Sequence, residues 1–188
     1  NLNSDIIIGT DFLLQNYLYY INNIYSIVVF SADDYFNVPD FKSNEFLYRY
    51  IVNIIDIAKE KNIKTILIKT KHSDNEILNY SLNDNYLDFY NQEINTRKIL
   101  NYPPFSIIIK LIIKEKIKKD FDKRLSNARE ILKNEKKIEI IGENNIKDKN
   151  ETHIVIRINK DEYNSLKETM KKISKYSLLD INPEFLIK

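Results

Sequence analysis

The sequence contains no cysteine and only two glycines, Gly9 and Gly142, among its 188 residues. Without cysteine, the chain can form neither a disulfide framework nor a metal site built from thiolates. Loops that cradle nucleotide phosphates need glycine, and the sequence has no G-x-x-x-x-G-K-[ST], G-x-G-x-x-G or G-x-S-x-G motif. We therefore expect no cofactor and no nucleotide chemistry performed by this chain alone.

Long apolar runs are absent as well. No run approaches the roughly 20 residues that a membrane-spanning helix needs. The opening "NLNSDIIIGT" has neither the positive flank nor the apolar stretch of a signal peptide. We therefore expect no membrane partner and a cytoplasmic location, which a chain without cysteine also permits. The chain does not begin with Met, which is compatible with a fragment of a longer protein.

The net charge of +2 conceals an uneven distribution. Residues 1–104 hold nine of the 29 Lys and Arg and thirteen of the 27 Asp and Glu, a net charge of −4. Residues 105–188 hold the other twenty basic and fourteen acidic residues, a net charge of +6. A basic second half indicates either an anionic partner or solvated helix faces in a lysine-rich chain.

The first half alternates apolar runs with stretches of helical periodicity. Buried strands that alternate with helices predict a parallel sheet of the α/β class. The predicted elements are strands at 4–10, 24–34 and 64–70, a turn at 38–41, and helices at 43–62, 75–82 and 85–101. Because helices end before a residue that precedes proline, we expect Pro103 to stop the last of these helices.

The second half predicts the order β-α-β-β-α-β, which is typical of a ferredoxin-like α+β domain. The predicted elements are strands at 105–115, 137–142, 152–160 and 178–187, helices at 118–135 and 162–176 with Asp161 as a cap, and a polar loop at 143–151. We therefore predict two domains, residues 1–103 and residues 104–188.

Few side chains offer catalytic or metal chemistry. The pair Asp33–Asp34 ends a predicted buried strand, where it could bind a metal, act as an acid and base, or simply cap a turn. His72 and His153 are the only histidines and lack the spacing of metal ligands. His153 either faces a ligand beside Arg157 or is a surface histidine. We predict no catalytic residue and no metal site.

Basic side chains of the second half are the predicted contacts to nucleic acid. On the exposed face of the predicted sheet, Lys110, Lys114, Arg157 and Lys160 would bind phosphates, unless the first domain covers that face. The predicted residues are Lys110, Lys114, Lys147, Lys149, Arg157 and Lys160. They rest on charge and strand position alone.

Several motifs, in order along almost the whole chain, resemble one family. "DIIIGT" and "IYSIVVFSADDYFNVPDFKSNEFLYRYIVNII" resemble the second helicase lobe of the primosomal replication-restart helicases, the PriA (primosomal protein N′) family. "DFYNQEINTRKILNYPPFSIIIKLII" resembles the entry into that family's C-terminal domain, and "LLDINPEFLI" resembles its ending. The positions that match the family's motifs are Gly9, Thr10, Pro39, Asp40, Phe41, Lys42, Glu45, Tyr102, Pro103, Pro104 and Phe105.

The helicase motif itself departs from the family's pattern. When the motif is aligned on Glu45, Ile57 and Glu60 occupy the positions of two arginines that reach the ATP phosphates in the family. Asp56 and Lys59 occupy the positions of its glycines. The family's Lys-Gly pair is missing near 15–16, and its cysteine zinc module is absent. Because an arginine finger contributes about 10³–10⁵ in rate, we predict that this chain does not hydrolyse ATP.

The resemblance implies a remnant helicase lobe followed by a ferredoxin-like domain. The predicted function is binding of forked or single-stranded DNA in replication restart, together with restart proteins and without ATP-driven unwinding. Two alternatives remain: a protein-interaction scaffold without a nucleic-acid role, and part of an active 3′–5′ helicase completed by an upstream motor lobe.

Overall fold

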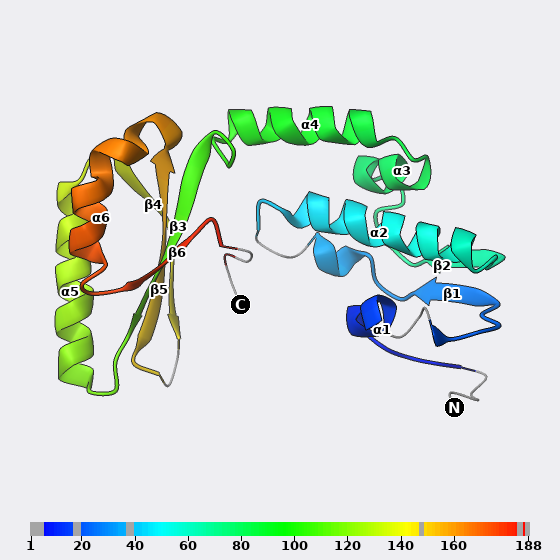
Figure 1. Ribbon diagram of the computed structural model, residues 1–188, viewed down its shortest axis with the longest axis horizontal. Coiled ribbons are helices and arrows are strands. Elements are labelled where there is room, and N and C mark those ends of the chain that lie inside the picture. The colour runs from blue at the N-terminus through cyan, green and yellow to red at the C-terminus, as the bar shows by residue number, and fades with distance from the viewer. Residues whose placement is uncertain (1–5, 17–19, 37–39, 147–148, 184–185, 187–188) are drawn as a thin grey trace. The chain divides into compact units, whose positions relative to one another are not determined.

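The computed structural model describes residues 6–16, 20–36, 40–146, 149–183 and 186. The chain forms two compact units, Asn1–Glu93 and Ile94–Lys188. The first contains a parallel sheet and the second an antiparallel sheet, so the protein is of mixed α/β class, as predicted. Figure 1 labels the elements. The assignment of domains to 1–103 and 104–188 stays a prediction.

The first unit places helices around a two-stranded parallel sheet. Strand β1 pairs in register with β2, with Ser26 opposite Thr65 and Val29 opposite Ile68. Helix α2 buries an apolar stripe that includes Leu47, and the apolar period predicted from the sequence explains this stripe. The elements are α1 (Asp11–Asn16), β1 (Ser26–Val29), the 3₁₀ helix η2 (Asp33–Tyr35), α2 (Ser43–Glu60), β2 (Thr65–Ile68), α3 (Glu76–Leu82) and α4 (Tyr86–Ile99).

Two predictions for the first unit are wrong. Residues 6–10 form no strand, and Ile6 and Ile8 are exposed, although the run at 4–10 was expected to be a buried strand. Strand β1 is only four residues long, and Val28 and Leu67 are exposed opposite each other on the outer face of the sheet. An apolar run in a strand is buried only when a helix or another sheet covers it. Among the described residues, none covers this face of the parallel sheet.

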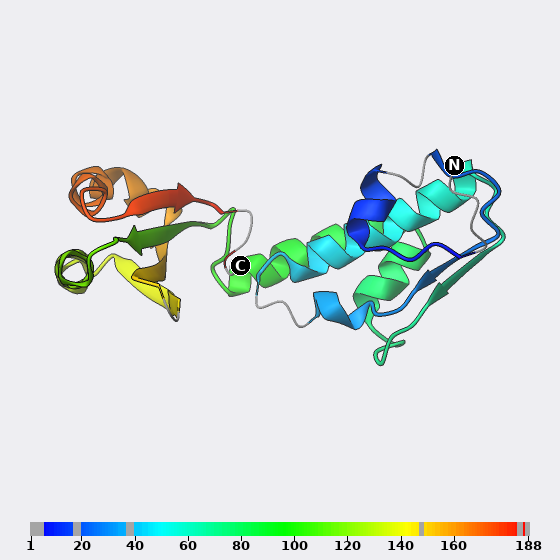
Figure 2. The same ribbon diagram turned by 90° about the horizontal axis from the view of Figure 1, so that it is seen from below.

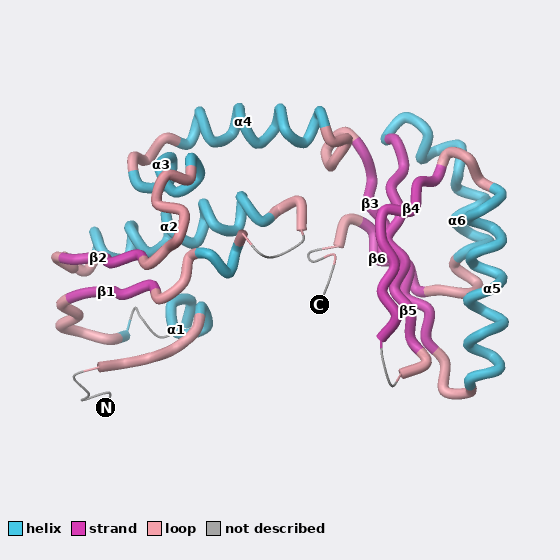
Figure 3. The backbone as a smooth tube through the Cα atoms, turned by 180° about the vertical axis from the view of Figure 1, so that it is seen from behind, coloured by secondary structure: helices cyan, strands magenta, loops and turns pink. Residues whose placement is uncertain are grey.

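The second unit is a four-stranded antiparallel sheet with two helices on one face. The strand order is β4-β5-β3-β6, and Figures 2 and 3 show α5 and α6 on the same side of the sheet. The elements are β3 (Ser106–Lys114), α5 (Lys118–Asn134), β4 (Ile138–Ile146), β5 (Glu151–Asn159), the 3₁₀ helix η3 (Lys160–Leu166), α6 (Lys167–Ile173) and β6 (Leu178–Ile181). The predicted order of strands and helices is confirmed.

The core of the second unit follows from strand and helix periodicity. Alternate apolar residues of the two central strands point toward the helices. They pack against apolar residues of α5 that are spaced by three and four positions. Each fully buried apolar side chain contributes about 1.5–3 kcal/mol relative to exposure. The buried residues that form this contact are Ile109, Leu111, Ile113, Ile154, Ile156 and Ile158 of the strands and Phe121, Leu125, Ala128 and Leu132 of α5.

Residues 143–146 of the polar segment that was predicted as a loop at 143–151 are strand. Strand β4 continues to Ile146 and β5 begins at Glu151, so the turn between them is short. An irregularity between Ile140 and Gly142 lets β4 stay paired with β5. The polar side chains at 143–145 are exposed, so this part of the strand needs no apolar residues. The helix expected after Asp161 starts instead as the 3₁₀ helix η3, with Asn159 at its N-terminal cap position.

Helix α4 ends before the prolines, and asparagine rather than proline ends it. Asn101 adopts a left-handed conformation, with φ of 51°. The backbone N–H of Tyr102 then donates to the carbonyl of Arg97 at 2.8 Å, the geometry of a Schellman-type helix end. The helix therefore stops at Ile99, four residues ahead of Pro103.

Among the helices that the structure describes, none is long and apolar enough to cross a membrane.

Candidate nucleic-acid interface

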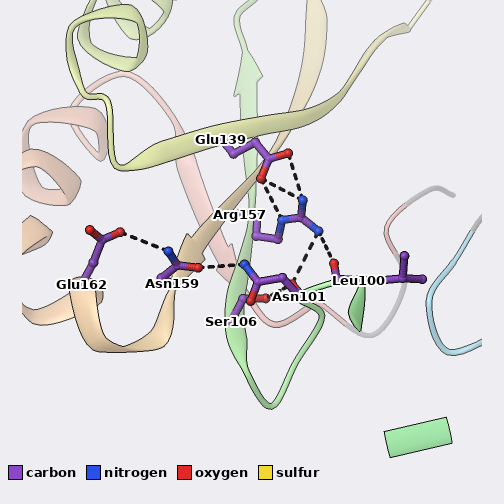
Figure 4. A network of polar contacts seen from close by, with 7 residues as sticks. All are labelled: Leu100, Asn101, Ser106, Glu139, Arg157, Asn159 and Glu162. Carbon is purple, nitrogen blue, oxygen red and sulfur yellow. Dashed lines mark hydrogen bonds and ion pairs between the residues drawn. The ribbon is translucent and has the colours of Figure 1, made fainter. Parts of the chain in front are cut away.

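An open polar pocket of about 340 Å³ lies where β4 and β5 meet the segment that precedes β3. Its lining is almost entirely polar, with both amide and charged side chains. The lining residues are Asn101, Lys136, Lys137, Glu139, Arg157, Asn159 and Glu162. Figure 4 shows the hydrogen bonds that join most of them. Among the predicted contacts to nucleic acid, Arg157 is the one that lines this pocket.

Arg157 is the centre of this network. Its guanidinium forms a bidentate pair with Glu139, with nitrogen–oxygen distances of 2.8 to 3.0 Å. The same side chain donates to the backbone carbonyl of Leu100 at 2.7 Å and lies 5.7 Å from the ring centre of Tyr102. The Arg157 side chain is only 17% exposed. Its donors are therefore used within the protein, which leaves little of the guanidinium for a phosphate.

Asn101 joins the end of α4 to the sheet. Its side-chain amide donates to Asn159 at 2.7 Å, and its carbonyl accepts from the hydroxyl of Ser106 at 2.6 Å. The following segment turns tightly, with a bond from the N–H of Phe105 to the carbonyl of Tyr102 and a cis peptide bond between Pro103 and Pro104. The Tyr-Pro-Pro-Phe motif thus forms a hydrogen-bonded turn that leads into β3.

The sheet face without helices carries three cations, each opposite a carboxylate residue on the neighbouring strand. Arg157 lies opposite Glu139 and Lys114 lies opposite Glu151, with an ion pair in each case. Lys110 lies opposite Asp180 in the register of β3 and β6. Lys110 is also only 5% exposed. The three cations on this face therefore stand opposite three carboxylates, and the face has no excess of positive charge from them.

The remaining predicted contacts lie elsewhere. Lys149 is exposed at the turn before β5, and Lys160 is exposed at the start of η3. Lys147 lies outside the described residues. Sequence reasoning missed the basic pair Lys136 and Lys137, which lines the pocket from the turn after α5. Two adjacent lysines between a helix and a strand were the available signal.

The motif positions of the first unit mostly shape turns. The carboxylate of Asp40 accepts from the N–H of Lys42 at 2.9 Å, and its carbonyl accepts from the hydroxyl of Ser43, which begins α2. Glu45 lies in the first turn of α2, where a negative charge is favourable. Phe41 precedes this helix, and Pro39 lies outside the described residues.

Gly9 and Thr10 directly precede α1. The carbonyl of Thr10 accepts from the N–H of Leu13 at 2.8 Å. A Cβ atom at position 9 would lie 2.6 Å from the Cβ of Leu13, so only glycine fits there without a shift of the chain. Of the pair at 15–16, Asn16 donates to the carbonyl of Phe12.

The acidic pair Asp33–Asp34 lies at the carboxyl end of β1, and both carboxylates are bonded. Asp33 accepts from the hydroxyl of Thr70 at 2.6 Å and from the N–H of Lys71, at the end of the neighbouring strand. These bonds, that of Thr70 foremost, lower the pKa of Asp33 below its ordinary value. Asp34 accepts from the hydroxyl of Ser31 at 3.0 Å. Asp33 therefore ties the two strand ends together, whereas the bond of Asp34 is local.

The two histidines lie in different environments. The ring of His72 contacts Phe36 edge-on, with ring centres 5.6 Å apart. His153 lies 2.8 Å from Glu151, and this pair together with Lys114 forms a small polar cluster on β3 and β5. The bond from Lys114 and the contact with His153 lower the pKa of Glu151. No cluster of three or more potential metal ligands occurs among the residues that the structure describes.

The two positions of the family's arginines differ in exposure. Ile57 is 1% exposed and packs in the core of the first unit with Ile54 and Val29. Glu60 and Asp56 are exposed at the end of α2, and Asp56 pairs with Lys59 at 3.9 Å. A side chain at position 57 therefore points into the core.

Comparison with known proteins finds curated relatives named replication restart protein PriA. The chain is 33% identical over 117 residues to that of Borreliella burgdorferi, which covers 62% of this chain and 17% of the relative. It is 29% identical over 110 residues to that of Chlamydia trachomatis (58% and 14%) and 25% identical over 138 residues to that of Thermotoga maritima (73% and 18%). The chain spans less than a fifth of these relatives. No family model matches it. The predicted resemblance to PriA is confirmed.

Proposed function

We propose that this chain, as a relative of the replication restart proteins PriA, acts in replication restart by binding forked or single-stranded DNA. The observation that carries the proposal is the charge of the second unit. Residues 94–188 contain 22 of the 29 basic and 14 of the 27 acidic residues, a net charge of +8. Residues 1–93 hold the remaining seven and thirteen, a net charge of −6. Nucleic-acid affinity depends on such basic domains.

The fold of each unit supports the same proposal. The order β-α-β-β-α-β with the sheet order β4-β5-β3-β6 agrees with a ferredoxin-like C-terminal domain. Two parallel strands with α2 between them agree with a remnant of a helicase second lobe. Lys149 and Lys160, both exposed, are the predicted phosphate contacts that the geometry favours. Under this proposal, the protein partners of the chain are other proteins of replication restart.

The chain is proposed to lack ATP-driven unwinding of its own. The positions of the family's arginines are held by a buried apolar residue, Ile57, and by an acid, Glu60. Neither can stabilise the charge of a phosphoryl transfer. An active helicase completed by an upstream motor lobe instead predicts DNA-stimulated ATP hydrolysis by the longer protein. Measuring ATP hydrolysis by the longer protein, with and without DNA, distinguishes an active helicase from a chain without ATP-driven unwinding.

Fluorescence anisotropy tests the DNA proposal. The 188-residue chain is titrated into labelled forked, duplex and single-stranded DNA at about 50 mM and about 200 mM salt. We expect binding at low salt that weakens steeply at high salt, because counterions are released from the phosphates. An absence of binding to every DNA at low salt would overturn the proposal.

A protein-interaction scaffold is the second candidate, and one observation favours it. Val28, Phe30 and Leu67 are 49%, 71% and 56% exposed on or beside the outer face of the parallel sheet. Parallel sheets are ordinarily covered on both faces. Replacing Val28 and Leu67 with Thr would abolish partner binding under this candidate and leave DNA binding unchanged under the first.

A further inference from the structure

We infer that the second unit contacts the backbone of duplex DNA through its helix layer rather than through the helix-free face of its sheet. This inference rests on the proposed DNA-binding function and assigns its surface and the form of DNA that fits it. The surface, called here the lysine surface, consists of Lys136, Lys137, Lys167, Lys171, Lys172 and Lys175. All six are exposed.

The helix-free face of the sheet is a poor surface for binding phosphates because its cations already lie opposite carboxylates. Lys114 and Arg157 form ion pairs with carboxylates of the neighbouring strand, at 3.0 and 2.8 Å. Lys110 is 5% exposed and stands opposite Asp180. A DNA phosphate bound there would have to displace these carboxylates or lie close to them, at a cost in repulsion.

The lysine surface has the opposite character. Among the described residues, none of its six ammonium groups has a carboxylate within ion-pair distance. On α5, by contrast, Lys118, Arg124 and Arg129 are each paired with an acid, whereas Lys119, Lys123 and Lys133 are exposed and form no ion pair among the described residues. The lysine surface thus consists of cations that remain available to a polyanion.

Two contacts place the two parts of the lysine surface side by side. The ammonium of Lys137 donates to the hydroxyl of Ser165 at 3.2 Å, and the hydroxyl of Thr169 donates to Glu135 at 3.3 Å. The turn after α5 is therefore held against η3 and the start of α6. Lys167 and Lys171 follow one helical turn apart, about 6 Å along the axis, so exposed lysines continue from this turn along α6.

The composition of this surface selects duplex over single strands. Binding of single strands depends on aromatic side chains on which bases stack. No exposed aromatic residue occurs on α5, η3 or α6, all of which the structure describes in full. Flexible ammonium groups on rigid helices contact phosphates without reading bases. The surface therefore fits the double-stranded arm of a fork and is insensitive to sequence.

Paired substitutions in the 188-residue chain test the inference. The variant Lys171→Ala/Lys172→Ala removes two charges from exposed helix positions where Ala is well tolerated. We expect its affinity for a duplex to fall about tenfold at low salt, and the slope of log affinity against log salt to decrease by about two. The matched control Lys118→Ala/Arg124→Ala removes two α5 cations that are paired with acids outside the lysine surface, and it should change duplex affinity less than about twofold.

Melting curves first establish that each variant folds, and Lys136→Ala/Lys137→Ala replaces the first pair if it does not. Wild-type binding together with an unchanged affinity of the lysine-surface variant overturns this inference and leaves the DNA-binding function standing. A larger loss in the control, or tighter binding to single strands than to duplex, also overturns it. If the wild-type chain binds no DNA, the proposed function fails and this inference with it.

Discussion

At the scale of single residues, Arg157 shows how one side chain can hold several segments. It pairs with Glu139 on the adjacent strand and donates to Leu100 at the end of α4. Only a planar guanidinium presents donors in both directions at once, whereas an ammonium is a point charge. The residue expected to bind phosphate therefore works as a joint between β5 and the segment that enters β3.

Replacing Arg157 with Lys tests this role. The fork to Glu139 and the bond to the Leu100 carbonyl cannot both be kept, so we expect the free energy of unfolding to fall by about 1–3 kcal/mol. The matched change Arg129→Lys affects a half-exposed pair with Glu143 and should cost less than about 1 kcal/mol. Urea unfolding of both variants measures the difference. Equal losses would contradict the assignment.

Ile57 and Glu60 give a second prediction, on the lost helicase motif. Ile57→Arg places an unpaired charge in the core of the first unit, and we expect destabilisation by about 4 kcal/mol or more. Glu60→Arg alters an exposed position and should change stability by about 0.5 kcal/mol at most. Thermal melting measures both. A stable Ile57→Arg protein that hydrolyses ATP would show that position 57 can still reach a nucleotide.

At the scale of elements, the first unit depends on bonds between strand ends. Asp33 follows β1 and accepts from Thr70, which follows β2. Because the two strands are parallel, their carboxyl ends meet at one edge, and a carboxylate there can tie both. Burial and the bond to Asp11 raise the pKa of Tyr35, which lies on the adjoining 3₁₀ helix. The acidic pair thus has a structural role at this edge.

The bond between Thr70 and Asp33 predicts a dependence on pH. The pKa of Asp33 is lowered below 3.8, mainly by the Thr70 hydroxyl. The unfolded chain therefore takes up the proton first, so the stabilisation is complete above about pH 4 and is lost as the pH falls toward the folded pKa. Thr70→Val should raise the Asp33 pKa and flatten this acid loss, whereas Thr70→Ser keeps the donor. NMR titration of the carboxylate and acid unfolding measure the effect. An unchanged Asp33 pKa in Thr70→Val would contradict it.

The β4–β5 hairpin shows what element prediction could not reach. The alternation in 152–160 predicts β5 correctly, because its apolar residues face the helices. The segment "ENNIKDKNE" has no such alternation, since β4 is an edge strand and its polar side chains need no burial. Pairing with β5 alone makes residues 143–146 a strand. Local sequence does not contain that information.

At the scale of the whole molecule, charge is divided between the two units. The first carries a net charge of −6 and the second +8, although the chain as a whole carries only +2. The second unit has its own core of buried residues from the sheet and both helices. Acidic residues in the same chain repel DNA phosphates, most strongly at low salt where screening is weak.

A chain reduced to residues 94–188 should therefore fold and bind DNA more tightly than the full chain. We expect cooperative melting, because the core and the Arg157 network lie within this unit. Affinity at about 50 mM salt should exceed that of the full chain, and the difference should shrink at about 200 mM. Circular dichroism and anisotropy measure these quantities. Weaker binding by the shorter chain would show that the first unit contributes contacts of its own.

The sequence by itself determined the order of helices and strands in the second unit, the apolar faces of α2 and α5, and the resemblance to PriA. These depend on local spacing, because periods of two and 3.6 residues state which side of an element is buried. Only the tertiary structure decided which cations are available. Lys114 and Arg157 face carboxylates because of the register between strands, which the irregularity at Ile140 and Gly142 helps to set. The sequence states which residues are charged, but whether a charge is neutralised depends on neighbours that are distant in the chain.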